Sequence, residues 1–250
     1  MTPYERVWAR MAGQPVDKVP NLNIAMALVA KCAGVSYREY AQNYKKLVEG
    51  NLYCVEHFGF DAVSAISDPM RETASFGATI TFPEDAVPHS TPALLQKDCD
   101  LSKLKIVSPY ENDRTLDRIR AVELFREKVG GEIPIIGWVE GVLAECADLR
   151  GVTELMYDLA EDEEYLPELM EIVHDQQKAF AKAQVDAGAD IIGMGNAVAS
   201  LIGPSLYEEY AMDYDQKIVA YVHSLGAKVK LHICGNITPL LPLLRKVGPD

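Results

Sequence analysis

Hydrophobic and polar positions follow two patterns along this chain, one typical of helices and one typical of buried strands. In residues 113–129 apolar side chains recur at a period of about 3.6 positions, which predicts an amphipathic helix ended by the glycines at 130–131. Caps, breakers and polar character predict further helices at residues 2–10, 37–57, 166–187 and 205–224. Thr2 and Glu5 have the spacing of a capping box, and Ser205 is the expected cap of the last helix.

Between these helices lie short, continuously apolar runs, which are typical of parallel strands covered on both faces. The predicted strands are residues 19–24, 59–67, 134–140, 189–195 and 227–231. Residues 76–88 predict a β-hairpin inserted after the second strand. The repeated order of helix, glycine, buried strand and polar tip is typical of successive βα units and predicts an α/β fold, a (β/α)8 barrel.

The strand count falls short of a closed barrel. Five strands are predicted where a (β/α)8 barrel has eight, and residues 247–250 have the pattern of a further strand beginning. We therefore expect residues 1–250 to form one barrel domain that is incomplete at its C-terminus, with its last strands beyond residue 250 of a longer polypeptide.

Composition narrows the function classes. The chain has 250 residues, 48% of them hydrophobic, and a net charge of -13, which disfavours nucleic acid and anionic membranes as partners. No apolar run is long enough to span a bilayer. Five scattered cysteines without a signal peptide indicate a reducing, cytoplasmic location with free or metal-bound thiols.

Polar residues interrupt the apolar pattern where the predicted strands end, which is where barrel enzymes gather their active sites. They are Asn21 or Asn23, Asp68, Glu140, Asn196, His232 and Cys234. His232 and Cys234 are two positions apart, so in a strand both side chains face the same way and could share one zinc ion. The alternative is that Cys234 is a small buried apolar residue and His232 a hydrogen-bonded strand-end histidine.

Glu140 and Asp68 carry weaker signals. Glu140 directly follows a buried strand, so its carboxylate must reach a polar site or a partner. Asp68 precedes Pro69 and could equally be a turn residue.

Several segments in order along the chain resemble the uroporphyrinogen decarboxylase superfamily. These are residues 6–13, 16–20, 66–68, 188–192, 199–204 and 232–235. The last one is similar to the corrinoid-dependent methyltransferase branch, whose members move a methyl group from a methylcobalamin-bearing protein to a thiol such as coenzyme M. In that branch a His-x-Cys pair and a distant cysteine hold zinc. His232 and Cys234 match the pair, and the distant cysteine has no counterpart up to residue 250.

The resemblance implies a zinc-dependent methyltransferase. Zinc would convert an acceptor thiol into the nucleophilic thiolate. From its position at the end of a strand alone, we expect Glu140 to be a metal ligand in the fourth position before the acceptor arrives and then to leave. Asp68 and Asn196 would orient the polar tail of the small-molecule acceptor. The sequence has no Asp-x-His-x-x-Gly motif of cobalamin binding, so the methylcobalamin is expected on a separate corrinoid protein partner.

Two other functions stay open. One is a tetrapyrrole decarboxylase, since Asp68 matches the catalytic aspartate of uroporphyrinogen decarboxylases. However, residues 20–27 lack the family's arginines, and Ala147 falls where its tyrosine is expected. The other is a non-catalytic barrel that binds a corrinoid or a pterin.

Overall fold

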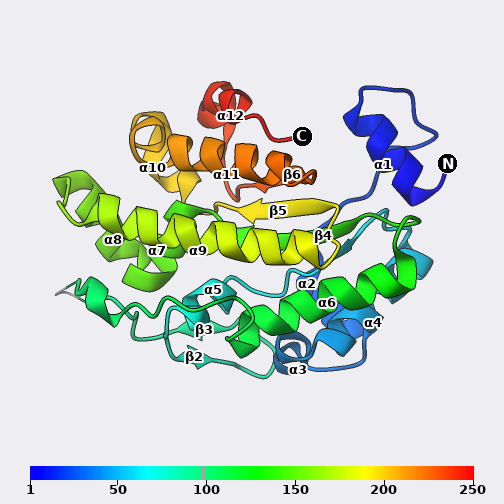
Figure 1. Cartoon of the computed structure of the whole chain (residues 1–250), viewed down its shortest axis with the longest axis horizontal. Helices are drawn as coiled ribbons and strands as arrows, with labels where there is room; N and C mark the ends of the chain where they lie inside the picture. Colours follow the sequence, from blue (N-terminus) through cyan, green and yellow to red (C-terminus); the bar gives the residue numbers. More distant parts are fainter. Residues whose placement is uncertain (97–98) are drawn as a thin grey trace.

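Four parallel strands form the central sheet of the computed structural model, which describes residues 1–96 and 99–250 (Figure 1). In their order across the sheet they are β1 (Val63–Ser64), β4 (Ile135–Glu140), β5 (Ile191–Gly195) and β6 (Lys228–His232). All three neighbouring pairs are parallel, as the continuously apolar runs predict.

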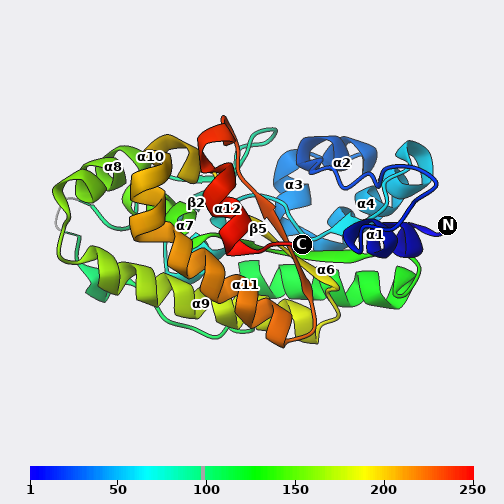
Figure 2. The same ribbon diagram turned by 90° about the horizontal axis from the view of Figure 1, so that it is seen from above.

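Long helices cover the outer face of this sheet. They are α4 (Tyr44–Phe58), which packs on β1, α6 (Asp113–Val129) and α9 (Leu166–Asp186), which pack on β4, and α11 (Met212–Ser224), which packs on β6. Helices α6, α9 and α11 lie along one side of the strands when the molecule is seen from above (Figure 2). The alternation of parallel strands and outer helices confirms the predicted α/β class.

Shorter elements connect these layers. The helices are α1 (Pro3–Met11), α2 (Met26–Cys32), α3 (Tyr37–Gln42), α5 (Met70–Ser75), α7 (Val142–Arg150), α8 (Val152–Glu161), α10 (Ala199–Leu206) and α12 (Leu241–Val247), with one π-helix at Tyr207–Ala211 and 3₁₀ turns at Leu101–Lys103 and Thr238–Leu240. Among the described residues, no helix is both long and apolar enough to cross a membrane.

The two faces of the sheet bury separate apolar clusters. The larger cluster lies between the sheet and the outer helices and includes Ile135 and Val139 of β4. The smaller one lies on the opposite face. Its members are Val7, Ala62, Ile66, Ile136, Trp138 and Ile191. Since side chains of a strand alternate in direction, β4 serves both clusters, and the smaller one occupies the face that a barrel turns inward.

Two predicted elements differ because the side chains of Asp61 and Asn43 accept backbone hydrogen bonds. The strand expected at 19–24 is wrong: these residues form no strand, and the Asn21 backbone instead exchanges hydrogen bonds with Asp61. The helix expected at 37–57 is broken at Asn43, whose side chain accepts from the Lys45 backbone N–H at 3.1 Å and begins α4.

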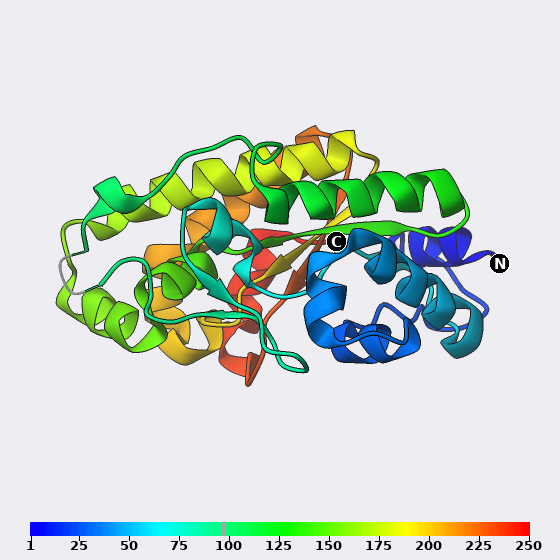
Figure 3. The same cartoon turned by 90° about the horizontal axis from the view of Figure 1, so that it is seen from below.

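Other boundaries also shift. The hairpin is confirmed, with β2 (Ile80–Thr81) paired antiparallel to β3 (His89–Ser90), slightly later than predicted (Figure 3). Ser205 does not cap a helix but lies inside α10, after a kink at Gly203, which has a φ of 73°. Helix α12 runs to Val247, and the backbone N–H of Asp250 then donates to the Val229 carbonyl of β6 at 3.0 Å, so the further strand expected from residues 247–250 stays a prediction.

Candidate functional site

The end of β6 places His232 beside Cys234. The Cys234 Sγ lies 3.3 Å from His232 Nε2, with Cys234 exposed and His232 half-buried. Burial and the neighbouring Lys230 charge lower the pKa of His232, so its imidazole is neutral at pH 7 and has a nitrogen lone pair to offer. The two side chains face the same way, as their spacing predicts.

The strand register brings Glu140 to the same row of the sheet. Glu140 pairs with Gly195 of β5, and Gly195 pairs with His232 of β6. Laterally paired residues of parallel strands point to the same face, so Glu140 and His232 both project from the inner face at the carboxyl ends of their strands.

Two donors hold one oxygen of the Glu140 carboxylate. Its Oε1 accepts hydrogen bonds from Arg71 Nη2 at 2.8 Å and from Trp138 Nε1 at 3.1 Å. The Trp138 ring lies 6.3 Å from the His232 ring, between centroids. Burial raises the pKa of Glu140 well above its ordinary value, although the Arg71 charge opposes this shift.

Sequence reasoning missed the charged residues that surround Glu140. Arg71 and Glu72 lie on α5 and are almost fully buried, and Glu72 accepts from the Glu140 backbone N–H at 2.8 Å. Glu145 and Asp148 lie on α7, where burial raises the pKa of both and brings that of Asp148 to about 8. The signal that could have found them is the presence of charged residues in the otherwise buried helices α5 and α7.

Asp68 is joined to this cluster through Arg71. Its carboxylate pairs with Arg114 Nη2 at 2.6 Å and accepts from Ser67 Oγ at 2.6 Å, while its backbone carbonyl accepts from Arg71. Burial raises the pKa of Asp68, but the charges of Arg114 and Arg71 outweigh this and hold it below its ordinary value. The Asp68 carboxylate is therefore an ionised partner of Arg114.

Asn196 lies next to the row, but its side chain turns toward α11. Its backbone N–H donates to the His232 carbonyl at 2.9 Å, and its Nδ2 donates to Asp215 at 3.0 Å. Tyr207 donates to the same carboxylate at 2.7 Å, and burial raises the pKa of Asp215 to about 6. The structure thus places Asn196 where it ties β5 to β6 and α11, and its role toward an acceptor stays a prediction.

The donor set fits two ligands of a zinc ion. Neighbouring nitrogen and sulfur ligands of tetrahedral zinc lie about 3.5 Å apart, given bonds of about 2.0–2.1 Å and 2.3 Å, and the His232–Cys234 spacing is close to this. Within residues 1–96 and 99–250, no three His, Cys, Asp or Glu side chains are arranged to hold a metal together. Glu140 is in the same row as the pair but is engaged by Arg71.

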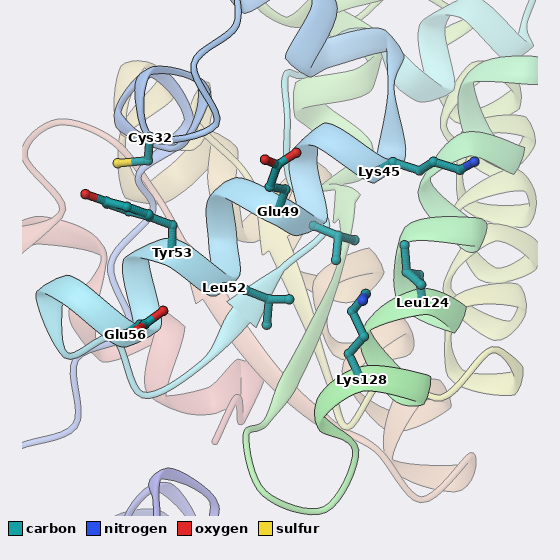
Figure 4. A pocket seen from close by; sticks show the side chains of 9 residues that line it. Cys32, Lys45, Glu49, Leu52, Tyr53, Glu56, Leu124 and Lys128 are labelled. Carbon is teal, nitrogen blue, oxygen red and sulfur yellow. The ribbon is translucent and has the colours of Figure 1, made fainter.

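A cavity of about 630 Å³ lies elsewhere, between α4 and α6 on the outer helical layer (Figure 4). Lys45, Glu49 and Tyr53 line it from α4, and Leu124 and Lys128 line it from α6. None of the predicted site residues borders this cavity, so it is not part of the site at the strand ends.

Comparison with known proteins gives a consistent family match. The family model described as uroporphyrinogen decarboxylase (URO-D) matches residues 2–250. The chain is 31% identical to the methylcobamide:CoM methyltransferase MtbA of Methanosarcina mazei, over 99% of this chain and 74% of that protein. It is 32% identical to MtbA of Methanosarcina acetivorans, with the same coverage.

A solved structure and a more distant relative agree with this match. The structure of a methyltransferase from Methanosarcina mazei superposes with a TM-score of 0.87 at 26% identity, covering 99% of this chain and 74% of that one. The uroporphyrinogen decarboxylase of Trichlorobacter lovleyi is 24% identical over 95% of this chain and 72% of its own length.

Proposed function

Since this chain belongs to the uroporphyrinogen decarboxylase family, we propose that it transfers a methyl group from a methylated corrinoid, carried by a partner protein, to the thiol of a small acceptor. Relatives named methylcobamide:CoM methyltransferases, at 31% and 32% identity over nearly the whole chain, support an enzyme of the corrinoid-dependent methyltransferase type. Coenzyme M is the acceptor that their names suggest. The observation that carries the proposal is the His232–Cys234 pair at the end of β6.

The exposed position of the pair suits this chemistry. Cys234 is open to solvent, so a thiol acceptor and a corrinoid presented by another protein can both approach it. His232 and Cys234 would hold zinc, which when bound acts as a Lewis acid that lowers the pKa of an acceptor thiol. Zinc and the corrinoid protein partner are part of the proposal.

The transfer itself is a displacement at carbon. The thiol proton leaves to solvent, the thiolate sulfur forms a bond to the methyl carbon, and the methyl–cobalt bond breaks with its electron pair staying on cobalt. The buried indole of Trp138 and the half-buried His232 ring line this end of the inner face.

The decarboxylase alternative finds less support in the site. Asp68, which matches the catalytic aspartate of that reaction, is almost fully buried and paired with Arg114, and Ala147 is buried in α7 where a tyrosine would be expected. A carboxylate in that state cannot meet a large substrate without giving up its ion pair.

The test compares Cys234→Ala and His232→Ala with the unchanged protein. We expect both variants to lose bound zinc and to transfer methyl groups from methylcobalamin to coenzyme M more slowly. The loss of rate should be at least about 10–100-fold, which is typical when a residue that only supports a metal ligand is removed. Zinc is measured by metal analysis, and transfer by the absorbance change when the methyl–cobalt bond breaks.

Cys32→Ala is the matched control, because Cys32 is a partly buried free cysteine on α2 that borders the cavity between α4 and α6, which none of the predicted site residues does. It should change neither readout. Full transfer by the metal-free protein or by Cys234→Ala would remove the proposal. Tight corrinoid binding without transfer, unaffected by both variants, would favour the non-catalytic alternative.

A further inference from the structure

Two glycines of β5 face inward where side chains of β4 lie across them. A Cβ atom added to Gly195 would stand 2.5 Å from Glu140 Oε2, and one added to Gly193 would stand 2.2 Å from Cε3 of the Trp138 ring. Real Cβ atoms are essentially never found at such distances, so any residue larger than glycine would displace these groups.

The backbone does not explain these glycines. Neither Gly193 nor Gly195 has a positive φ, so other residues could adopt the same strand conformation. Glycine weakens a strand interior and often marks a close approach of another group. What these positions require is the empty space above the Cα atom.

The register shows where the crossing side chains lead. Gly195 stands between Glu140 and His232 in one row, and neighbouring strands are about 4.8 Å apart. Glu140 Oε2 occupies the place of a Gly195 side chain, one strand closer to His232 than the Glu140 backbone is. Oε1 is held by Arg71 and Trp138, and among residues 1–96 and 99–250 no hydrogen bond engages Oε2.

We propose that Gly195 is a positioning residue: its missing side chain lets the free oxygen of Glu140 reach across β5 toward the His232–Cys234 pair. Gly193 does the same for Trp138, whose indole N–H fixes the other oxygen of the carboxylate. This inference rests on the proposed zinc site, because it assigns Glu140 to the ion that the pair would hold.

The first experiment measures the Zn²⁺ affinity of Gly195→Ala by competition with a chromophoric chelator. Gly137→Ala is the matched control, because a Cβ there would also be crowded, 2.9 Å from Gln184 Oε1, but on the face covered by α9. We expect Gly195→Ala to weaken Zn²⁺ binding about 10–100-fold, and Gly137→Ala to leave it unchanged at a similar cost in melting temperature. Equal affinities of the two variants would overturn the inference.

A double-mutant cycle separates positioning from general damage. If Gly195 acts through Glu140, then Gly195→Ala causes no further loss of Zn²⁺ affinity in a Glu140→Gln background. Additive losses would mean that Gly195 acts on the fold alone, and the inference would be wrong.

Glu140→Asp keeps the test decisive if Gly195→Ala fails to fold. This variant retains the charge but is one methylene shorter, so its carboxylate no longer spans β5. We expect it to bind Zn²⁺ as weakly as Glu140→Gln and to alter the visible absorption of bound Co²⁺. A Zn²⁺ affinity of Glu140→Asp equal to that of the unchanged protein would show that the length of the residue 140 side chain does not matter and would contradict the inference.

Failure of the proposed function looks different from failure of this inference. If the unchanged protein binds no Zn²⁺, or if Cys234→Ala binds it as tightly, the zinc site itself is wrong and the inference falls with it. If Zn²⁺ binding depends on Cys234 but not on Gly195 or on the length of residue 140, only the inference is overturned.

Discussion

Arg71 is surrounded by carboxylates instead of water, and this decides the geometry of the site at the residue scale. Its guanidinium is fully buried, 2.8 Å from Glu140 and 3.4 Å from Glu72. An unpaired buried charge is costly, so each of these three groups keeps the others in place. The Glu140 orientation is therefore fixed from the α5 side.

Replacing Arg71 by methionine should destabilise the protein strongly. The variant leaves two buried carboxyl groups without their cation, and breaking such a pair costs about 3–5 kcal/mol of unfolding free energy. Urea unfolding at pH 7 measures this loss. The control is Lys182→Met, which removes a cation from the exposed pair with Asp186 and should leave the unfolding midpoint unchanged. Equal unfolding midpoints for the two variants would show that the Arg71 charge does not stabilise the buried carboxyl groups of Glu72 and Glu140.

At the scale of elements, α2 and α4 cross at a glycine. A Cβ atom added to Gly50 would stand 2.4 Å from the carbonyl oxygen of Val29 and 2.8 Å from its Cγ1. The carbonyl belongs to the α2 backbone and cannot yield as a flexible side chain does. The absence of a side chain at residue 50 thus sets how closely the two helices pack.

Gly50→Ala should therefore destabilise the protein although alanine favours helices. Overpacking costs about 1–3 kcal/mol, which outweighs a gain in helix propensity of about 1 kcal/mol. Thermal unfolding followed by circular dichroism tests this, with Glu49→Ala on the neighbouring exposed position as the control. A raised melting temperature for Gly50→Ala would contradict the close crossing.

The predictability of an element from sequence depended on whether its signals were local. The helix at Asp113–Val129 has its full apolar period and its cap in one stretch, and it is confirmed to the residue. The strand expected at 19–24 is wrong because Asp61, about 40 residues away, satisfies the Asn21 backbone. The kink before Ser205 arises from the φ of Gly203, which apolar periodicity does not reveal.

The candidate site likewise has one part that local sequence patterns predict and another that depends on contacts between distant segments. Strand alternation predicts that His232 lies beside Cys234, and the structure places them 3.3 Å apart although β6 ends at His232. The place of Glu140 in the same row depends on the register of three strands, and the roles of Arg71 and Gly195 depend on side chains that cross between strands. No local pattern contains that information.

At the scale of the whole molecule, the acidic character of the chain extends into its interior. The net charge is -13, and burial raises the pKa of several carboxyl groups of the described residues. These are Glu72, Glu140, Glu145, Asp148 and Asp215. Four of the five lie on or beside α5 and α7. Burial therefore makes ionisation of these carboxyl groups less favourable in the folded chain than in the unfolded one.

This predicts that the protein is less stable at alkaline than at mildly acidic pH. Above pH 5 the unfolded chain has lost the protons of these groups while the folded chain still binds them, so stability falls as pH rises toward the folded pKa values. That window extends to about pH 8 for Asp148 and to about pH 6 for Asp215. Asp17 and Asp68 have lowered pKa values and act in the opposite sense, but only at more acidic pH.

Urea unfolding at pH 5.5, 7 and 8.5 measures this slope, and Glu145→Gln provides its internal check. Glu145 accepts from Thr73 at 2.8 Å through one oxygen, and its other oxygen is buried without a partner among the described residues. Glutamine keeps the size and the acceptor while removing the titration, so the variant should lose less stability between pH 5.5 and 8.5 than the unchanged protein. Stability that rises over this range, or an equally steep fall in Glu145→Gln, would mean that the interior carboxyl groups are ionised in the folded protein.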